Sequence, residues 1–404
     1  MAIVRPFKAI RPTRDKAGLV ASRSYLSYSE ETLKEKLENN PFTFLHIINP
    51  DYKKEKKLKG TNKFIAIREK FNEFKKKNIF ITEKKKVFYI YQQKTKNHIY
   101  TGIIASTSVD DYINNKIKKH EKTLVKREKM FSKYLSTIGF NAEPVLLFHK
   151  KNNIVEHIIN LYIEKRSEYE FATTNQAIHK LWIIDDEKDI KAIEKSFEEI
   201  DILYIADGHH RSASSTLLSK NNDFRNSQYF MSYLINENQL NIISFNRLIK
   251  LKNNLNKKTF LNKIESNFNI IKKNKKILEP KNKNEISMYF AKFWYLLTFK
   301  NKLIYSNCIE NLDSVILSEH ILKPILGIKN EKKDSNIVYE PGNTPLSIIS
   351  EKVNSGEFDL AFILKPISIK ELKEVADNNL IMPPKSTYIE PKLRSGLTIY
   401  SFND

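Results

Sequence analysis

The residue types best suited to chemistry stand together in one short segment of the sequence, YIADGHHRSAS, which runs from Tyr204 to Ser214. Its central residues are Asp207, Gly208, His209, His210 and Arg211. An apolar run before Asp207 predicts a strand, Gly208 permits a tight turn, and the residues after the turn favour a helix. In α/β proteins, ligands bind at the carboxyl ends of strands, and a helix N-terminus suits a phosphate. The segment therefore predicts a phosphate-binding or catalytic site.

Each side chain of this segment could have either a chemical role or a purely structural one. Arg211 could bind two phosphate oxygens, Asp207 could hold Mg²⁺ or act as a base, and the histidines could donate to phosphate or relay a proton. In the structural alternative, Asp207 caps the helix, Gly208 makes the turn and the histidines are polar surface. Two adjacent histidines beside an arginine favour the functional interpretation. They do not form a zinc motif, because adjacent histidines rarely bind one ion together.

A second candidate segment lies near the C-terminus, MPPKSTYIEPKLRSG, from Met382 to Gly396. The side chains in it that could donate to an anion are Lys385, Ser386, Thr387, Lys392 and Arg394. Prolines make the segment rigid, and a rigid loop with several donors forms a good anion clamp. A solvent-facing loop is the alternative, but apolar residues at 380–382 and 397–400 bracket the segment and favour a binding role.

Three further residues are weaker candidates. His120 and Glu121 lie in a basic stretch, where Ser108 and Asp111 predict the start of a helix that reaches His120. Sequence neighbours do not share a helix face, so a joint catalytic role requires the helix to end there, and an exposed His120 is an equal alternative. Arg247 follows a predicted strand and suits a ligand contact as well as a structural ion pair.

The excess of positive charge is explained mostly by the amino-acid composition of the chain and indicates little about function. The chain has 69 Lys+Arg against 47 Asp+Glu, a net charge of +22, but 11 of these residues are arginine, which leaves 69 − 11 = 58 lysines. Glycine occurs 9 times in 404 residues. Such a composition is typical of an AT-rich genome, and arginine should then persist where a bidentate donor is needed. Nucleic-acid binding ranks last among the functions considered, because the sequence has no recognised nucleic-acid motif.

Composition also limits the class of protein. Hydrophobic residues at 41% and aromatic residues at 11% are typical of a folded chain. Cys308 is the single cysteine, so neither an internal disulfide nor a thiolate metal cluster is expected. No apolar run approaches the roughly 18 residues of a membrane span, and residues 1–12 lack the apolar core of a secretory signal. We expect a cytoplasmic protein without a membrane partner.

Alternating apolar and amphipathic segments predict an α/β (α+β) fold with mixed sheets and several domains. The main expected strands are Thr43–Ile48, Val87–Gln92, His98–Ala105, Val145–His149, Ile178–Ile184 and Ile202–Ala206, and the main expected helices are 29–39, 61–77, 108–120, 154–164, 185–199 and 212–219. The middle of the chain favours βαβ units. We expect an N-terminal α/β region (1–106), a central α/β region with the DGHHR strand, turn and helix (107–250), and a C-terminal α/β region with the MPPKSTYIEPKLRSG loop (251–404).

Four motifs together resemble a known family. DGHHR, MPPKSTYIEPKLRSG, VRPFKAIRP (Val4–Pro12) and IKKHEKT (Ile117–Thr123) occur in the order found in the bacterial domain-of-unknown-function family one thousand and fifteen. Around DGHHR, that family is in turn similar to free serine kinases of the ParB/sulfiredoxin-like fold, which transfer phosphate between an adenine nucleotide and free L-serine. The resemblance implies a ParB/sulfiredoxin-like element around Ile178–Ser219.

The resemblance implies roles for the residues that match the motifs. Catalytic roles would fall to Asp207, His209, His210, His120 and Glu121, with Asp207 also a metal ligand, and substrate or phosphate binding to Gly208, Arg211, Lys385, Ser386, Thr387, Lys392 and Arg394. The implied cofactors are Mg²⁺ and ATP or ADP. One segment departs from the family, which usually has Arg-Pro-Tyr-Asp where residues 23–26 read Arg-Ser-Tyr-Leu. If that aspartate serves chemistry in relatives, Glu30 or Glu31 replaces it here, or the activity is lost.

Two functions of different classes follow. The first is a small-molecule phosphotransferase, an ATP- or ADP-dependent kinase that forms O-phosphoserine from free L-serine or runs the reverse reaction. The alternative is a non-catalytic nucleotide-binding switch of the ParB-like type. The expected partners are a nucleotide and a small amino acid, and the sequence does not indicate an oligomeric state.

Overall fold

The chain folds into two compact units in a computed structural model, which describes residues 2–220, 224–251, 256–300 and 307–403. The first unit contains residues 1–240 and 391–404, and the second contains residues 241–390. These boundaries differ from those of the three consecutive regions predicted above (1–106, 107–250 and 251–404). The α/β (α+β) class with several sheets is confirmed. Among the described strands, the largest sheet is mixed and the other sheets are antiparallel.

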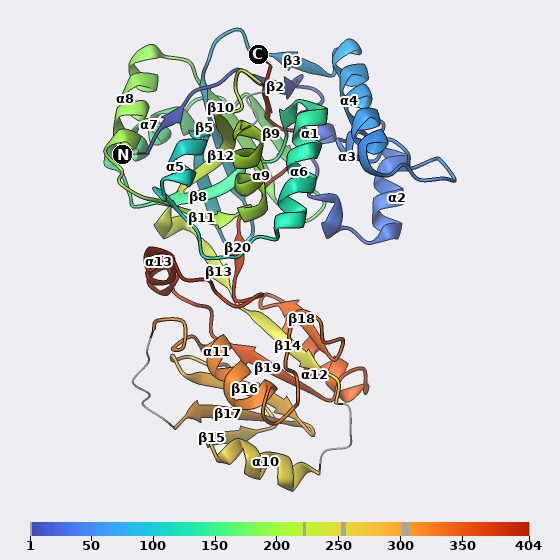
Figure 1. The fold of residues 1–404 in the computed structure, drawn as a ribbon, viewed down its shortest axis with the longest axis vertical. Coiled ribbons are helices and arrows are strands. Elements are labelled where there is room, and N and C mark those ends of the chain that lie inside the picture. Colours follow the sequence, from blue (N-terminus) through green and yellow to red (C-terminus); the bar gives the residue numbers. More distant parts are fainter. Residues whose placement is uncertain (1, 221–223, 252–255, 301–306, 404) are drawn as a thin grey trace. The chain divides into compact units, whose positions relative to one another are not determined.

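A nine-stranded sheet forms the centre of the first unit (Figure 1). Its order is β6 (Ile117–Lys118), β11 (Leu203–Asp207), β8 (Val145–His149), β12 (Tyr229–Asn236), β5 (Ile99–Ser108), β4 (Phe88–Lys94), β10 (Ile178–Ile184) and β9 (Tyr169–Ala172), with β1 (Val4–Arg5) also paired to β5. The pairs β6–β11 and β8–β12 are parallel, and the other pairs are antiparallel. The carboxyl ends of β6 and β11 therefore lie at the same edge of the sheet as the amino end of β8.

Helices cover both faces of this sheet. On one face, α7 (Asn153–Ile163) and α8 (Glu187–Glu198) bury apolar side chains against Leu203 and Ile205 of β11 in one core cluster. The alternate residue Tyr204 points to the opposite face, where it stacks on Phe148. That face carries α5 (Val109–Ile113), α6 (Val125–Ile138) and α9 (His209–Lys220), and α9 contacts β8 and β12 (Figure 1).

A smaller layer of the first unit joins its N-terminal and C-terminal segments. The four-stranded sheet has the order β3 (Phe80–Thr82), β2 (Ala9–Pro12), β21 (Ile399–Ser401) and β7 (Phe140–Asn141). The short elements α1 (Ala17–Val20), η1 (Tyr25–Ser27) and α3 (Leu45–Ile48), with the longer α2 (Glu30–Asn39) and α4 (Gly60–Lys76), complete the region. Phe71 and Phe74 of α4 pack on Phe80 of β3 in a second core cluster.

The second unit is built on a six-stranded antiparallel sheet. Its order is β15 (Phe268–Asn274), β17 (Phe293–Phe299), β16 (Glu285–Phe290), β19 (Leu360–Leu364), β14 (Phe245–Ile249) and β18 (Ile337–Pro341). On one face lie α10 (Lys257–Glu265), α11 (Asp313–Leu317) and the π-helical η3 (Ser318–Leu322), whereas α12 (Leu346–Asn354) packs on the other. The remaining elements are η2 (Glu237–Gln239, in the first unit), α13 (Ile369–Asp377) and the strand pair β13 (Asn241–Ile243) and β20 (Tyr388–Glu390).

Most predicted elements are present, but the strand predicted at residues 43–48 is wrong. Residues 43–48 were expected to form a strand, yet 45–48 form α3, because a short apolar run does not distinguish a strand from a buried helical turn. The expected βαβ unit is formed by parallel strands of one sheet that are not neighbours. β10 and β11 are consecutive along the chain and joined by α8, but four strands lie between them in the sheet. Within the described residues, none of the helices has the length and apolar character needed to cross a bilayer.

Candidate active site

The DGHHR segment forms a strand, a turn and a helix, as predicted. β11 ends at Asp207, with a register shift against β8 between Ile205 and Asp207 that marks an irregularity of the β-bulge type. Gly208 has φ +101°, and α9 begins at His209. A Cβ on Gly208 would lie 3.2 Å from Cζ of Arg211 and 3.3 Å from Cα of Val145. Glycine is therefore required at this turn both for its conformation and for space.

The carboxylate of Asp207 is shared by two cations. Its Oδ2 accepts a hydrogen bond from Nη2 of Arg211 at 2.6 Å, and its Oδ1 accepts one from Nζ of Lys392 at 3.0 Å. Desolvation alone would raise the pKa of Asp207, but Lys392 and Arg211 outweigh it and the pKa is lowered. Because 37% of the side chain is exposed, the two cations rather than burial decide the charge, and Asp207 is ionised.

Arg211 is fixed on several sides. Besides Asp207, its guanidinium donates to the carbonyl of Pro144 and lies 3.3 Å from Oε1 of Glu143. Both of these partners immediately precede β8, the strand paired with β11. The arginine is therefore held in one position at the N-terminus of α9, with a quarter of its side chain exposed.

His120 reaches the same site along a neighbouring strand. The predicted helix from Ser108 to His120 is wrong, since α5 ends at Ile113 and residues 117–118 form β6. β6 pairs in parallel with β11, with Ile117 opposite Leu203. Parallel strands end at the same edge of a sheet, so His120, which follows β6, emerges beside the turn that follows β11.

Two buried imidazoles meet there. The rings of His120 and His209 lie 4.6 Å apart in a T-shaped contact, and their side chains are 3% and 4% exposed. Burial lowers the pKa of His120 to about 4, despite the opposing influence of Asp207. Burial, and then His120, lower the pKa of His209 well below its usual value. Both rings are therefore neutral at neutral pH.

The polar atoms of these two rings are unevenly satisfied. Nδ1 of His209 lies 3.4 Å from Oε2 of Glu121, which is itself largely exposed. Within the described part of the chain, neither Nε2 of His209 nor Nδ1 of His120 has a hydrogen-bond partner. Buried polar atoms without partners are uncommon and are found where a ligand or water is expected. The third histidine, His210, is half-buried in the first turn of α9.

Small hydroxyl residues bring α9 close to its neighbours. Those at 212, 214, 215, 216 and 219 are buried, and each hydroxyl donates to a backbone carbonyl three or four residues earlier. Such bonds satisfy the hydroxyls within the helix and leave a narrow surface for packing. α9 packs closely on α6 (Figure 1), so the start of the helix is firmly positioned.

The C-terminal candidate segment is divided between the two units. Lys392 and Arg394 belong to the first unit, and the preceding residues Lys385, Ser386 and Thr387 belong to the second. The buried Arg394 donates from Nη2 to Oδ1 of Asn175 at 3.3 Å. The segment is also not one loop, because it contains strand β20.

The predicted binding residues of the second unit form a group of their own. Arg247 lies within β14, rather than after a strand, and is 1% exposed. Its guanidinium donates to the carbonyl of Phe245 at 2.5 Å and approaches that of Lys385 at 3.5 Å, and it lies 5.6 Å from the ring centre of Tyr339. The ammonium of Lys385 lies over the Phe245 ring, and Ser386 is buried.

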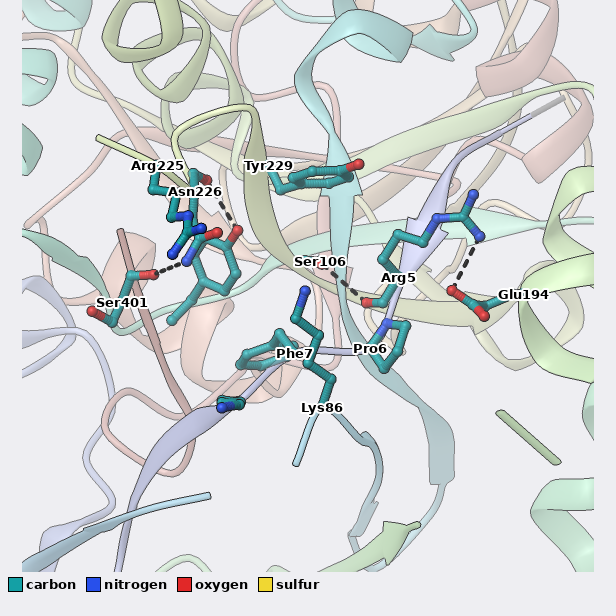
Figure 2. Close-up of a pocket in the computed structure, with 12 residues that line it drawn as sticks. Arg5, Pro6, Phe7, Lys86, Ser106, Glu194, Arg225, Asn226, Tyr229 and Ser401 are labelled. Carbon is teal, nitrogen blue, oxygen red and sulfur yellow. Dashed lines mark hydrogen bonds and ion pairs between the residues drawn. The ribbon is translucent and has the colours of Figure 1, made fainter. Parts of the chain in front are cut away.

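A hollow of about 610 Å³ in the first unit was missed by sequence reasoning. Exposed cations line it at Lys8, Lys86 and Arg225, together with the aromatic ring of Tyr229. Figure 2 shows Arg225 and Asn226 on one side and the Arg5–Glu194 ion pair on the other. Its residues come from six separate segments of the chain. The VRPFKAIRP motif supplies four of these residues and was the one signal of the hollow in the sequence.

The residues around Asp207 do not fit a metal ion held by protein ligands. Within the described ranges, no group of three or more His, Cys, Asp or Glu side chains could hold one. Both carboxylate oxygens of Asp207 already accept hydrogen bonds from cations. Charge at this place is neutralised by Lys392 and Arg211.

Comparison with known proteins identifies the family. The model of the family described as Protein of unknown function (DUF1015) matches residues 4–315, and the chain belongs to this family, as the four motifs predicted. No curated protein matches the chain.

Several solved structures are similar at low identity. A free serine kinase in complex with AMP is 14% identical with a TM-score of 0.37, over 75% of this chain and 91% of the kinase. A mutant free serine kinase in complex with ADP is 15% identical with a TM-score of 0.37, over 76% and 94% of the two chains. SbnI with a C-terminal truncation, from Staphylococcus aureus, is 14% identical with a TM-score of 0.37, over 74% and 87%.

Replacement of Gly208 by alanine should displace Arg211. The added methyl would meet the guanidinium at 3.2 Å while the backbone keeps a φ of +101° that alanine tolerates poorly. We expect Gly208→Ala to lower the free energy of unfolding by about 1–3 kcal/mol. Gly139→Ala is the matched control, because Gly139 has φ +81° and its nearest neighbour is 3.4 Å away. Equal losses in urea unfolding of the two variants would contradict crowding at Arg211.

The neutral His120 should make stability depend on pH. Its pKa is about 4 in the folded chain and about 6.5 when unfolded, so below pH 6.5 the unfolded chain binds a proton that the folded chain does not. Stability is then lost as the pH falls from 6.5 to 4, by about 3 kcal/mol for this residue. In urea unfolding at pH 7 and pH 4, His120→Gln should show a smaller difference than wild type. His98→Gln, at an exposed position, should match wild type.

Proposed function

We propose that the protein is a small-molecule phosphotransferase that moves a phosphoryl group between an adenine nucleotide and the hydroxyl of free L-serine or a similar amino acid. The observation that carries the proposal is the group at the end of β11. Asp207 holds Lys392 and Arg211 in fixed positions at the start of α9, next to two buried neutral imidazoles. Phosphoryl transfer needs positioned positive charge and an acceptor for the hydroxyl proton more than it needs covalent chemistry by the protein.

The two cations would bind the oxygens of the transferred group. Arg211 presents a planar fork that matches two phosphate oxygens, and Lys392 presents a point charge. Asp207 keeps both close together, and it limits their mutual repulsion before the substrate arrives. Since 25% of the Arg211 side chain and 39% of the Lys392 side chain are exposed, part of each cation remains accessible.

His209 is the proposed proton acceptor. If Nδ1 carries the ring proton and donates to Glu121, as their 3.4 Å separation permits, Nε2 keeps a lone pair. The substrate hydroxyl would transfer its proton to Nε2 as its oxygen bonds to phosphorus, the bond from phosphorus to the leaving nucleotide oxygen would break, and the proton would pass to solvent. The lowered pKa of His209 keeps the ring unprotonated and ready at neutral pH. His120 would position this ring, and His210 would face the incoming phosphate.

Mg²⁺ enters the proposal with the nucleotide. Mg²⁺ usually binds the phosphates and keeps several waters, so it does not require a cage of protein ligands. AMP and ADP, the ligands named for the similar free serine kinases, are the first nucleotides to test alongside ATP. Lys385, Ser386, Thr387 and Arg247 of the second unit, and the cytoplasmic location, stay predictions from the sequence.

The activity is tested by phosphate exchange with the purified full-length chain. Labelled ATP or ADP with L-serine and Mg²⁺ should yield O-phosphoserine, and the reverse mixture should release serine. Asp207→Asn should lower the rate at least 100-fold, because Lys392 and Arg211 lose their shared carboxylate. Asp185→Asn, at an exposed position of the same unit, should retain full activity. The proposal fails if wild type exchanges no phosphate with serine or other hydroxy amino acids.

The second candidate is a nucleotide-binding switch without turnover. It is favoured by residues 23–26, which read Arg-Ser-Tyr-Leu and lack the aspartate usual in the resembled family. It predicts that calorimetry detects ADP or ATP binding by wild type, while product assays detect no phosphorylated amino acid. Asp207→Asn should then change nucleotide affinity without any catalytic effect. Formation of O-phosphoserine would exclude this candidate.

A further inference from the structure

Two arginines lie opposite each other next to the proposed phosphotransfer site. Ser22 and Ser395 form an isolated antiparallel bridge, with N–H to carbonyl distances of 3.2 Å and 2.8 Å. In an antiparallel pair the residues after Ser22 face the residues before Ser395, so Arg23 lies opposite Arg394. Directly opposite positions bring side chains to within about 5 Å at Cβ, where like charges are destabilising.

Other arginines of the first unit are paired with acids. Three of them each contact two carboxylates, namely Arg5 with Glu194 and Glu198, Arg11 with Glu83 and Glu168, and Arg211 with Asp207 and Glu143. Among the described residues, neither Arg23 nor Arg394 makes an ion pair with a carboxylate. Among the described residues, Arg23 and Arg394 therefore lack the carboxylate partners that these three arginines have.

The described contacts of Arg394 do not compensate its buried positive charge. The residue is 8% exposed, and its guanidinium donates to the neutral side-chain amide of Asn175. Desolvation and the charge of Arg23 lower its pKa, against the influence of nearby tyrosines. Nδ1 of the fully buried His179 forms a hydrogen bond of 2.7 Å with the hydroxyl of Tyr91. Burial and the charges of Arg394 and Arg23 lower the pKa of His179 to about 3, so this ring is neutral.

We propose that Arg23 and Arg394 form a phosphate subsite, which binds a phosphate dianion between the two guanidinium groups. Two positive charges without an acid match a dianion, whereas a carboxylate would neutralise one of them. Arg394 is two residues after Lys392, so the Cα atoms of these two residues lie at most about 7 Å apart. Lys392 is the residue whose ammonium contacts Asp207. As a part of the same catalytic site the subsite rests on the proposed function, but phosphate binding itself requires no turnover.

The pair is tested by removing or reversing one charge. Arg23→Gln leaves one guanidinium, and Arg23→Glu places a carboxylate opposite Arg394, where it should form an ion pair. We expect both variants to lose affinity for O-phosphoserine or inorganic phosphate by roughly 10- to 100-fold in calorimetric titrations. Arg68→Gln, an exposed arginine of α4 without a role in the subsite, is the control and should bind as wild type does.

Stability of the unliganded chain separates a ligand site from a structural one. If the two charges await a dianion, Arg23→Gln should unfold at the same temperature as wild type or higher, and Arg23→Glu should unfold at a higher temperature. A clear loss of stability in Arg23→Gln, or unchanged phosphate affinity in both variants, would overturn the subsite.

Titrations with O-phosphoserine, inorganic phosphate and ADP show which substrate supplies the phosphate group that the subsite binds. Loss of affinity for O-phosphoserine and inorganic phosphate, with ADP binding unchanged, assigns the subsite to the phosphorylated amino acid. Loss of ADP affinity assigns it to the nucleotide. If wild type binds these ligands through Arg23 but exchanges no phosphate, the subsite stands and the proposed phosphotransferase activity fails. If exchange occurs and Arg23→Glu binds and reacts as wild type does, the activity stands and the subsite fails.

Discussion

The carboxylate of Asp207 is the contact on which the arrangement of the first unit's site depends. One oxygen holds Arg211, four residues later in α9, and the other holds Lys392, which is 185 residues away along the chain. The returning C-terminal segment is thereby attached to the turn after β11, while β21 pairs with β2 and β7 further along. Because the carboxylate is partly exposed, each ion pair contributes little to stability. The main effect of Asp207 is to hold the two cations next to each other.

Charged side chains are arranged differently around the proposed site than in the rest of the first unit. A net charge of +22 is spread over lysines that mostly meet solvent, whereas Arg11 and Arg211 of the first unit are paired with acids. Positive charge exceeds negative charge locally around Lys392, Arg394 and Arg23. Neutral imidazoles beside them add hydrogen-bonding atoms without further charge. Fixed cations with neutral acceptors suit an anionic substrate that arrives with its own counter-ion.

Local sequence patterns predicted the strand, turn and helix of DGHHR, because the apolar run, the glycine and the helix start are adjacent in sequence. They could not predict why His120 joins them. β6 has two residues, too few for a periodic signal, and its parallel pairing with β11 connects segments that are more than 80 residues apart. The same limit applies to the order of β10 and β11, which depends on the pairing of the whole sheet. The failure at residues 43–48 is different in kind, since four apolar residues favour a strand and a buried helical turn equally.

Arginine is rare in this chain, and the contacts of individual arginines show why lysine could not take their place. Lysine can replace arginine wherever a solvated charge suffices, but a lysine at position 211 could not contact the Asp207 carboxylate, the Pro144 carbonyl and Glu143 at once. The same planar group at Arg11 bridges two acids and the hydroxyl of Tyr169. Among the described residues, the guanidinium groups of Arg23 and Arg394 have no acid to bridge. Two guanidinium groups opposite each other, in a chain with 11 arginines among 69 basic residues, are what the binding of a phosphate dianion would require.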